Sequence, residues 1–307
     1  MAGESKAAVI GALVANAAIA VSKFIVAGLT GSSSMLSEAI HSSVDTGNEL
    51  LLLLGQHRSK KPPDEPHPYG YGPELYFWTF VVALIIFGVG GGMSIYEGIL
   101  HILHPEELSD PMWNYIVLGV AFVFEGISLS IALRGLLKEK RREGRTLWKT
   151  IRATKDPQVV AVFLEDSAAL SGLVIAFLGV FFSHLLGIPE LDGVASILIG
   201  LLLGGVALLL AREAKGLLVG EAADPRTRRR IRELVGSDPS VERVGALLTM
   251  QLGPEEVLLN LEVDFRDELS GRELEQAISR MEERIRAEVP EVRRSFIELS
   301  SLSPRQA

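Results

Sequence analysis

The sequence predicts an all-α bundle of six transmembrane helices, followed by a small cytoplasmic α+β domain. Two observations predict the bundle: six long apolar segments lie within the first 212 residues, and Lys and Arg residues occupy alternate connections between them. A third observation predicts the second domain, because the charged remainder of the 307-residue chain combines helix signals with strand-like alternation. We therefore expect a transmembrane domain over residues 1–212 and a cytoplasmic domain over residues 213–307.

Each apolar segment is long enough to cross a bilayer as a helix, which takes about 20 residues. Only helices and closed barrels satisfy the backbone within lipid, and these segments lack the strict alternation of a barrel strand. We expect the first segment to be retained, because no small-residue cleavage site follows it. The six expected helices span about residues 7–29, 33–56, 76–100, 113–137, 158–186 and 189–211.

The connections predict the orientation of the bundle. The first, third and fifth connections contain no Lys or Arg. The second, the fourth and the stretch after the last helix carry the basic residues, listed here: Arg58, Lys60, Lys61, Arg134, Lys138, Lys140, Arg141, Arg142, Arg145, Lys149, Arg152, Lys155, Arg212 and Lys215. Basic residues favour the cytoplasmic side. We therefore expect a multi-pass protein of a cell (inner or plasma) membrane, with both termini cytoplasmic.

Composition excludes several function classes. The net charge of −8 disfavours a nucleic-acid partner, and the lack of cysteine removes disulfides, thiolate metal sites and cysteine nucleophiles. The HExxH pattern of a metalloprotease is missing from the sequence. We expect a protein that is not an enzyme and that carries no organic cofactor.

The C-terminal region shows the order helix, strand, strand, helix, strand. Asp224 followed by Pro225 is a typical helix start. Alternation of apolar and polar residues from Val257 to Phe265 predicts a strand with one wet face. Ser270 with Glu273 is a capping box before the second helix. This order suggests a small open-faced sandwich whose modest core would benefit from pairing with a second copy.

The second segment carries a stripe of polar side chains, listed here: Glu38, His41, Asp45, Asn48 and Glu49. At about 100° per residue, all five lie within about 100° of one side of a helix. An ionisable group at membrane depth is a functional hypothesis by default, because its desolvation must be offset. The stripe must therefore face protein or water.

His41 and Asp45 are one helical turn apart, so both can reach a single cation. A neutral imidazole and a carboxylate suit a borderline divalent ion. The same spacing suits a plain hydrogen bond, which is the ordinary interpretation on a soluble helix. In a membrane segment beside two further carboxylates, we favour a metal site.

The fifth segment contains the adjacent carboxylates Glu165 and Asp166. They point about 100° apart, so one can face a central site while the other reaches a neighbour. Asp166 is the preferred metal ligand. Glu165 is open to three interpretations: a further ligand, a proton carrier, or a structural partner of Asn16 or Lys23.

The second connection is rich in turn formers and includes Asp64 and His67. These two side chains are candidates for a peripheral metal site. A solvated loop histidine is the ordinary alternative.

Three stretches of the chain resemble the cation diffusion facilitator family of divalent metal transporters: GLTGSSSMLSEAIHSSVDTGNELLLLLG, HPYGYGPELYFWTFVVALIIFGVGGGMSIYEGI and FLEDSAAL. The resemblance is closest to the branch that contains the eukaryotic mitochondrial zinc transporter. It implies six transmembrane helices, a ferredoxin-like cytoplasmic domain, a homodimer, and exchange of a divalent cation for protons.

The resemblance also implies a transport site made of two [HD]xxxD pairs. His41 and Asp45 match the first pair; Asp166 matches the second, in which Val162 replaces the usual histidine or aspartate. Glu165, Glu38, water or a backbone carbonyl is then needed to complete the shell. The family's cytoplasmic domain often binds zinc through histidines, but no histidine follows His184, so we expect the dimer to rest on packing.

The expected function is a proton-coupled antiporter that exports a divalent metal from the cytosol, with zinc as the favoured substrate. Metal binding requires neutral histidine and ionised carboxylates and so displaces protons. The alternatives are an exporter of manganese, iron, cobalt or cadmium with the same mechanism, a membrane metal sensor that does not transport, and a proton-coupled transporter of another solute. The expected partners are lipid, the cation and protons.

Overall fold

The computed structural model describes residues 2–105, 110–144 and 155–299. The chain divides into two compact units, one made of Met1–Arg58 with Glu74–Lys215 and the other of Ser59–Pro73 with Gly216–Ala307. Arg145, Lys149 and Arg152 of the fourth connection lie outside the described residues.

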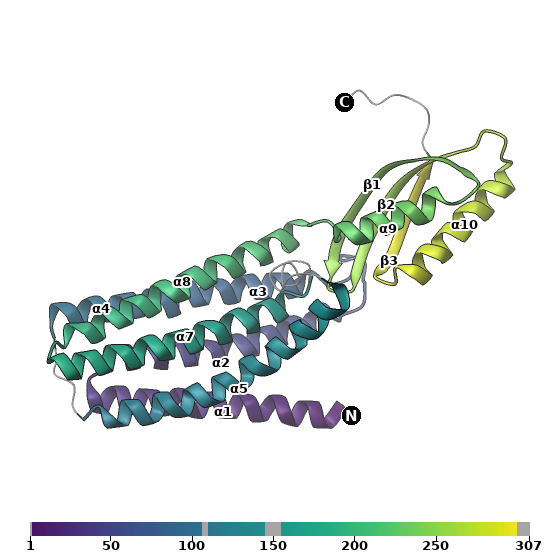
Figure 1. The fold of residues 1–307 in the computed structure, drawn as a ribbon. Helices are drawn as coiled ribbons and strands as arrows, with labels where there is room; N and C mark the ends of the chain where they lie inside the picture. The colour runs from purple at the N-terminus through teal and green to yellow at the C-terminus, as the bar shows by residue number, and fades with distance from the viewer. Residues whose placement is uncertain (1, 106–109, 145–154, 300–307) are drawn as a thin grey trace. The chain divides into compact units, whose positions relative to one another are not determined.

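The first unit is a bundle of long helices that run along a common direction (Figure 1). The helices are α1 (Ala2–Thr30), α2 (Ser33–Ser59), α3 (Glu74–Ile85), the π-helical stretch η1 (Ile86–Gly91), α4 (Gly92–Leu103), α5 (Met112–Glu143), α7 (Pro157–Leu186) and α8 (Glu190–Val219). Because α3, η1 and α4 follow without a break, they form one membrane segment, and the six expected helices are confirmed.

Five segments of the described chain are apolar and long enough to cross a membrane: Leu13–Thr30, Glu74–Leu103, Met112–Arg134, Pro157–Leu186 and Glu190–Val219. Large apolar side chains such as those of Val123, Ile131 and Leu201 are exposed on these segments, as lipid contact requires. The second segment, α2, is too polar to be among them. From Ser33 to Asn48 it is mostly buried, because its neighbours cover the polar stripe.

Glycines allow α8 to approach the segment that holds η1 and α4. A Cβ atom on Gly91 would lie 3.1 Å from the carbonyl oxygen of Gly200, and one on Gly98 would lie 2.6 Å from that of Gly193. Small residues of this kind are typical of close helix contacts in membranes. The apolar core beside this contact includes Val82, Ile86, Ile199 and Leu203.

The second unit contains α9 (Pro225–Gly236), β1 (Val241–Gly253), β2 (Glu256–Phe265), α10 (Gly271–Glu288) and β3 (Val292–Leu299). The sheet order is β1-β2-β3, with β1 antiparallel and β3 parallel to β2. The predicted order of elements and the α+β class are confirmed. Both sequence-predicted helix starts are also present: Asp224 accepts a hydrogen bond from the backbone N–H of Arg226, and Ser270 and Glu273 form the capping box.

One face of the sheet packs against both helices. Alternate residues of β2, from Val257 to Val263, form the core of this unit together with Ile231 of α9 and Met281 of α10. Leu248, Asn260 and Phe296 lie in register across the three strands on the other face. Leu248 is 63% exposed and Phe296 is 52% exposed. The unit is therefore an open-faced sandwich with an uncovered apolar row.

Candidate metal centre

A carboxylate from α8 holds the beginning of α2. Asp192 accepts hydrogen bonds from the backbone N–H groups of Ser33 at 2.6 Å and Ser34 at 3.2 Å, and from the hydroxyls of Ser32 and Ser34. The first N–H groups of a helix have no partner within the helix and favour negative charge. Asp192 therefore fixes the position of α2, a role that sequence reasoning missed because the partner lies about 160 residues away in sequence.

Lys23 of α1 engages the first acidic residue of the stripe. Its Nζ atom donates to Glu38 Oε2 at 2.9 Å and to Ser42 Oγ at 2.7 Å, and all three side chains are buried. A buried ion pair requires good geometry and further hydrogen bonds to offset desolvation. In this structure Glu38, proposed from the sequence as an additional ligand or proton carrier, is thus an ion-pair partner.

His41 and Asp45 lie beside each other on α2, with Nδ1 of His41 3.4 Å from Oδ1 of Asp45. His41 is only 2% exposed. Among the described residues, neither ring nitrogen of His41 nor Oδ1 of Asp45 has a hydrogen-bond partner. Leaving such a buried polar atom unsatisfied costs about 1–3 kcal/mol, so these atoms are the ones that a bound ion would satisfy.

A cavity of about 270 Å³ adjoins Asp45. Its polar wall comes from α1, α2, α5 and α7 and is formed by the following residues: Asn16, Ser42, Asp45, Glu49, Glu125, Ser128, Glu165 and Asp166. Val162 also lines it and is 38% exposed. The structure thus brings Asp45 and Asp166 to one cavity, while His41 lies next to it behind Asp45.

Hydrogen bonds orient the carboxylates on the cavity wall. Ser128 Oγ donates to Asp166 at 2.8 Å, and Asn16 Nδ2 donates to Glu49 at 2.9 Å. Glu165 accepts from Asn48 Nδ2 at 3.1 Å. The structural partner of Glu165 is therefore Asn48, and the sequence-based alternatives for that role, Asn16 and Lys23, were wrong because those two side chains bind acidic residues of α2.

Glu125 of α5 is a cavity residue that sequence reasoning missed. It lines the same cavity as Asp45, Glu165 and Asp166. The signal was present in the sequence, because Glu125 is a lone carboxylate in an otherwise apolar membrane segment.

Several carboxylates line the cavity, but they do not form a complete coordination shell. Among the described residues, no group of three His, Asp or Glu side chains is close enough to hold one ion. Binding an ion between α2 and α7 therefore requires these side chains to move toward it. The arrangement provides carboxylate oxygens and one imidazole as ligands. These groups can release protons when they bind a divalent cation.

Asp64 and His67 also lie together, in the second unit. The carboxylate of Asp64 accepts from the backbone N–H of His67 at 2.8 Å and from the Tyr71 hydroxyl at 2.7 Å, and Nδ1 of His67 lies 3.1 Å away. The Tyr71 hydrogen bond, followed by those from His67, holds the pKa of Asp64 below its usual value. These bonds account for the turn, and metal binding by the pair stays a prediction.

Comparison with known proteins supplies the context for this cavity. Residues 9–219 match the model of a cation efflux transmembrane domain. The chain is 37% identical over 243 residues to the mitochondrial proton-coupled zinc antiporter SLC30A9 of Mus musculus, covering 79% of this chain and 43% of that protein. The chain spans less than half the length of the mitochondrial antiporters that it matches.

Two further relatives come from a plant and a bacterium. Metal tolerance protein C4 of Arabidopsis thaliana is 32% identical over 265 residues, covering 86% of this chain and 58% of that protein. The cation-efflux pump FieF of Serratia proteamaculans is 27% identical over 257 residues, covering 81% of this chain and 79% of that protein.

Proposed function

The chain belongs to the cation efflux family, the cation diffusion facilitators, and on that premise we propose that it is an antiporter that exports a divalent metal ion in exchange for protons. The observation that carries the proposal is the cavity between α2 and α7. There, Asp45 and Asp166 share one space, and the unpartnered imidazole of His41 lies beside Asp45.

Charge repulsion supplies the coupling. Asp45, Glu165 and Glu125 line the same cavity. Neighbouring carboxylates in a poorly solvated cavity repel one another, and either bound protons or a bound cation removes that repulsion. The metal and the protons therefore compete for the same groups, and binding of one releases the other.

We propose zinc as the transported ion. Imidazole with carboxylates is a common zinc donor set, and similar proteins bear the name zinc antiporter. Val162 lines the cavity where an additional nitrogen or oxygen ligand would be useful. An oxygen-rich shell also suits manganese, iron or cobalt, so an exporter of manganese, iron, cobalt or cadmium with the same mechanism is the alternative.

The alternation of basic connections supports a multi-pass protein with both termini in the cytoplasm. We propose a cell membrane, inner or plasma, as its location, although similar proteins are named as mitochondrial. The uncovered row of Leu248, Asn260 and Phe296 supports a homodimer formed through the second unit.

Transport by purified protein in proteoliposomes tests the proposal. Zinc, manganese, iron(II), cobalt and cadmium are offered in turn with a proton gradient, and the flux of metal and protons is recorded. The wild-type protein should exchange zinc for protons. Asp45→Asn should abolish exchange while the protein remains folded, whereas Asp267→Asn, an exposed change in the second unit, should leave it intact.

Each other outcome selects an alternative. Flux with manganese or iron but not zinc would keep the mechanism and change the substrate. Metal binding without any flux would indicate a membrane sensor. Proton flux that depends on no metal would indicate a transporter of another solute.

A further inference from the structure

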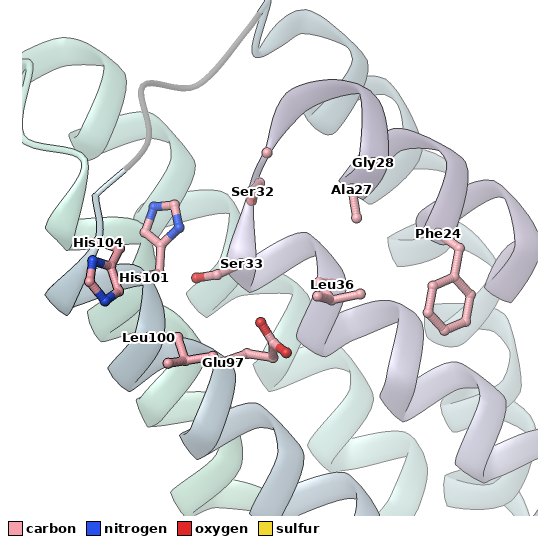
Figure 2. A pocket seen from close by; sticks show the side chains of 11 residues that line it. Phe24, Ala27, Gly28, Ser32, Ser33, Leu36, Glu97, Leu100, His101 and His104 are labelled. Carbon is pink, nitrogen blue, oxygen red and sulfur yellow. The ribbon is translucent and has the colours of Figure 1, made fainter.

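A second polar pocket lies where α1 ends and α2 begins. It has a volume of about 450 Å³ and is enclosed by the end of α1, the link between α1 and α2, and α4. Figure 2 shows Glu97 and His101 on α4, His104 just after the end of that helix, and Ser32 and Ser33 where the link meets α2. It shares no lining residue with the cavity around Asp45.

Two buried polar atoms of this pocket lack hydrogen-bond partners among the described residues. They are Nε2 of His101 and Oγ of Ser33, whose side chains are 8% and 5% exposed. Asp192 accepts from the backbone N–H of Ser33 but not from its hydroxyl. Native proteins rarely leave such atoms unsatisfied, so an unpaired pair in one pocket indicates a ligand.

The donor set identifies the class of ligand. Glu97 and His101 are four residues apart on α4 and so lie on the same side of that helix, and His104 follows as the residue that caps its C-terminal end. Two imidazoles and a carboxylate are typical ligands of zinc and cobalt(II).

We propose that Glu97, His101 and His104 form a second divalent-metal site, with the Ser33 hydroxyl or water completing the shell. In this structure the three side chains do not converge on one point. The buried ring of His101 provides the fixed ligand. His104 is exposed and Glu97 is partly exposed, so both can turn toward the ion.

The site has a place in transport. The α1–α2 link and the connection after α4 are free of Lys and Arg, which puts the pocket on the non-cytoplasmic side. The proposed antiporter releases its ion to this side. A role of the site in transport therefore rests on the proposed function, whereas metal binding by the site does not. The site would hold the exported ion after it leaves Asp45.

Zinc binding to the full chain in detergent tests the proposal without transport. Affinity and the number of ions bound per chain are measured by calorimetry and equilibrium dialysis. The background is Asp45→Asn with Asp166→Asn, which removes acidic ligands from the central cavity. His101→Asn is compared in this background with His184→Asn, a change to an exposed histidine that does not line the pocket.

We expect the background protein to bind zinc and His101→Asn to weaken that binding by about 100-fold or more, because loss of even an outer-shell partner costs about 10–100-fold. His184→Asn should have no effect.

If the buried change impairs folding, the exposed change His104→Asn provides the same test, with cobalt(II) absorption reporting lost imidazole coordination. Equal binding with and without the pocket histidines, or no binding in the background, would overturn the site. If the wild-type protein shows no metal flux in proteoliposomes, the proposed antiporter is contradicted, but the second metal site is not.

Discussion

The ammonium group of Lys23 lies 2.9 Å from Glu38 Oε2, and both side chains are almost completely buried. The pair joins α1 to the helix that carries His41 and Asp45. The other oxygen of Glu38 has no partner among the described residues, so Lys23 alone offsets its charge. Together with the hydrogen bond from Asn16 to Glu49, this contact links α1 to α2.

Lys23→Met should destabilise the protein by about 3–5 kcal/mol, because it leaves a buried carboxylate without its counter-charge. Lys23→Met with Glu38→Gln should recover most of the loss, since neither partner is then charged. Thermal unfolding of the purified variants measures both effects. A double variant no more stable than the single one would show that the pair does not act as a unit.

Glu125→Gln should weaken metal binding and slow exchange by about 10–100-fold, the range seen when groups around a metal site are removed. The reason is that Glu125 lines the same cavity as Asp45 and Asp166, so its carboxylate would lie beside a bound cation. Ser130→Ala on the same helix is the control, because the Ser130 hydroxyl only donates to the carbonyl of Gly126 within α5. Equal rates for Glu125→Gln and Ser130→Ala would remove Glu125 from the mechanism.

Val162→His should raise the preference for zinc over manganese. The new imidazole would enter the cavity one turn before Asp166, and nitrogen ligands favour zinc more than they favour manganese. Competition between the two metals in the proteoliposome assay gives the ratio directly. Val162→Ala controls for the change in cavity volume and should leave the ratio near that of the wild type.

Leu248→Glu with Phe296→Asp should convert the proposed dimer to monomers. Both side chains lie on the uncovered face of the sheet, where charges would be desolvated in an interface. Light scattering of the protein in detergent measures the mass. Arg272→Glu on α10 reverses an exposed charge on the helix that packs on the opposite face, and it should leave the mass unchanged.

Tyr71→Phe should raise the pKa of Asp64, because the Tyr71 hydroxyl makes the first contribution to holding that pKa down. A lowered pKa means that Asp64 contributes stability above its ordinary pKa and loses it as the pH falls through the lowered value. The second connection should therefore loosen at a higher pH in Tyr71→Phe. Carbon NMR titration of labelled aspartate checks this, with Asp64→Asn to assign the signal. An unchanged titration would show that His67 alone sets the Asp64 pKa.

Patterns within single segments of the sequence predicted much of the fold. Apolar length predicted the membrane segments, and the period of the polar stripe predicted that it faces protein or water; Glu38, His41 and Asn48 of the stripe are buried among neighbouring helices. The capping box at Ser270 and Glu273 is present because both partners lie within one turn. The match to the cation efflux domain confirms the family that the motifs resembled.

Such patterns could not predict contacts between segments that are distant in the sequence. The choice of Asn48 as the partner of Glu165, and of Lys23 as the partner of Glu38, depends on how the helices pack. The contact of Asp192 with the beginning of α2 likewise depends on where α8 packs. Hydrophobic periodicity says which side of a helix faces inward, but not which neighbour it meets.

The sequence by itself determined that this chain crosses a membrane and that α2 carries ionisable groups into the helical bundle, and it predicted the orientation, because length, charge and period are properties of single segments. Only the tertiary structure decided which carboxylates surround the cavity, since Asp45, Glu125 and Asp166 come from three helices. It also decided that His101 and Ser33 share a pocket. Both arrangements follow from helix packing, in which small residues and buried polar contacts select one set of neighbours.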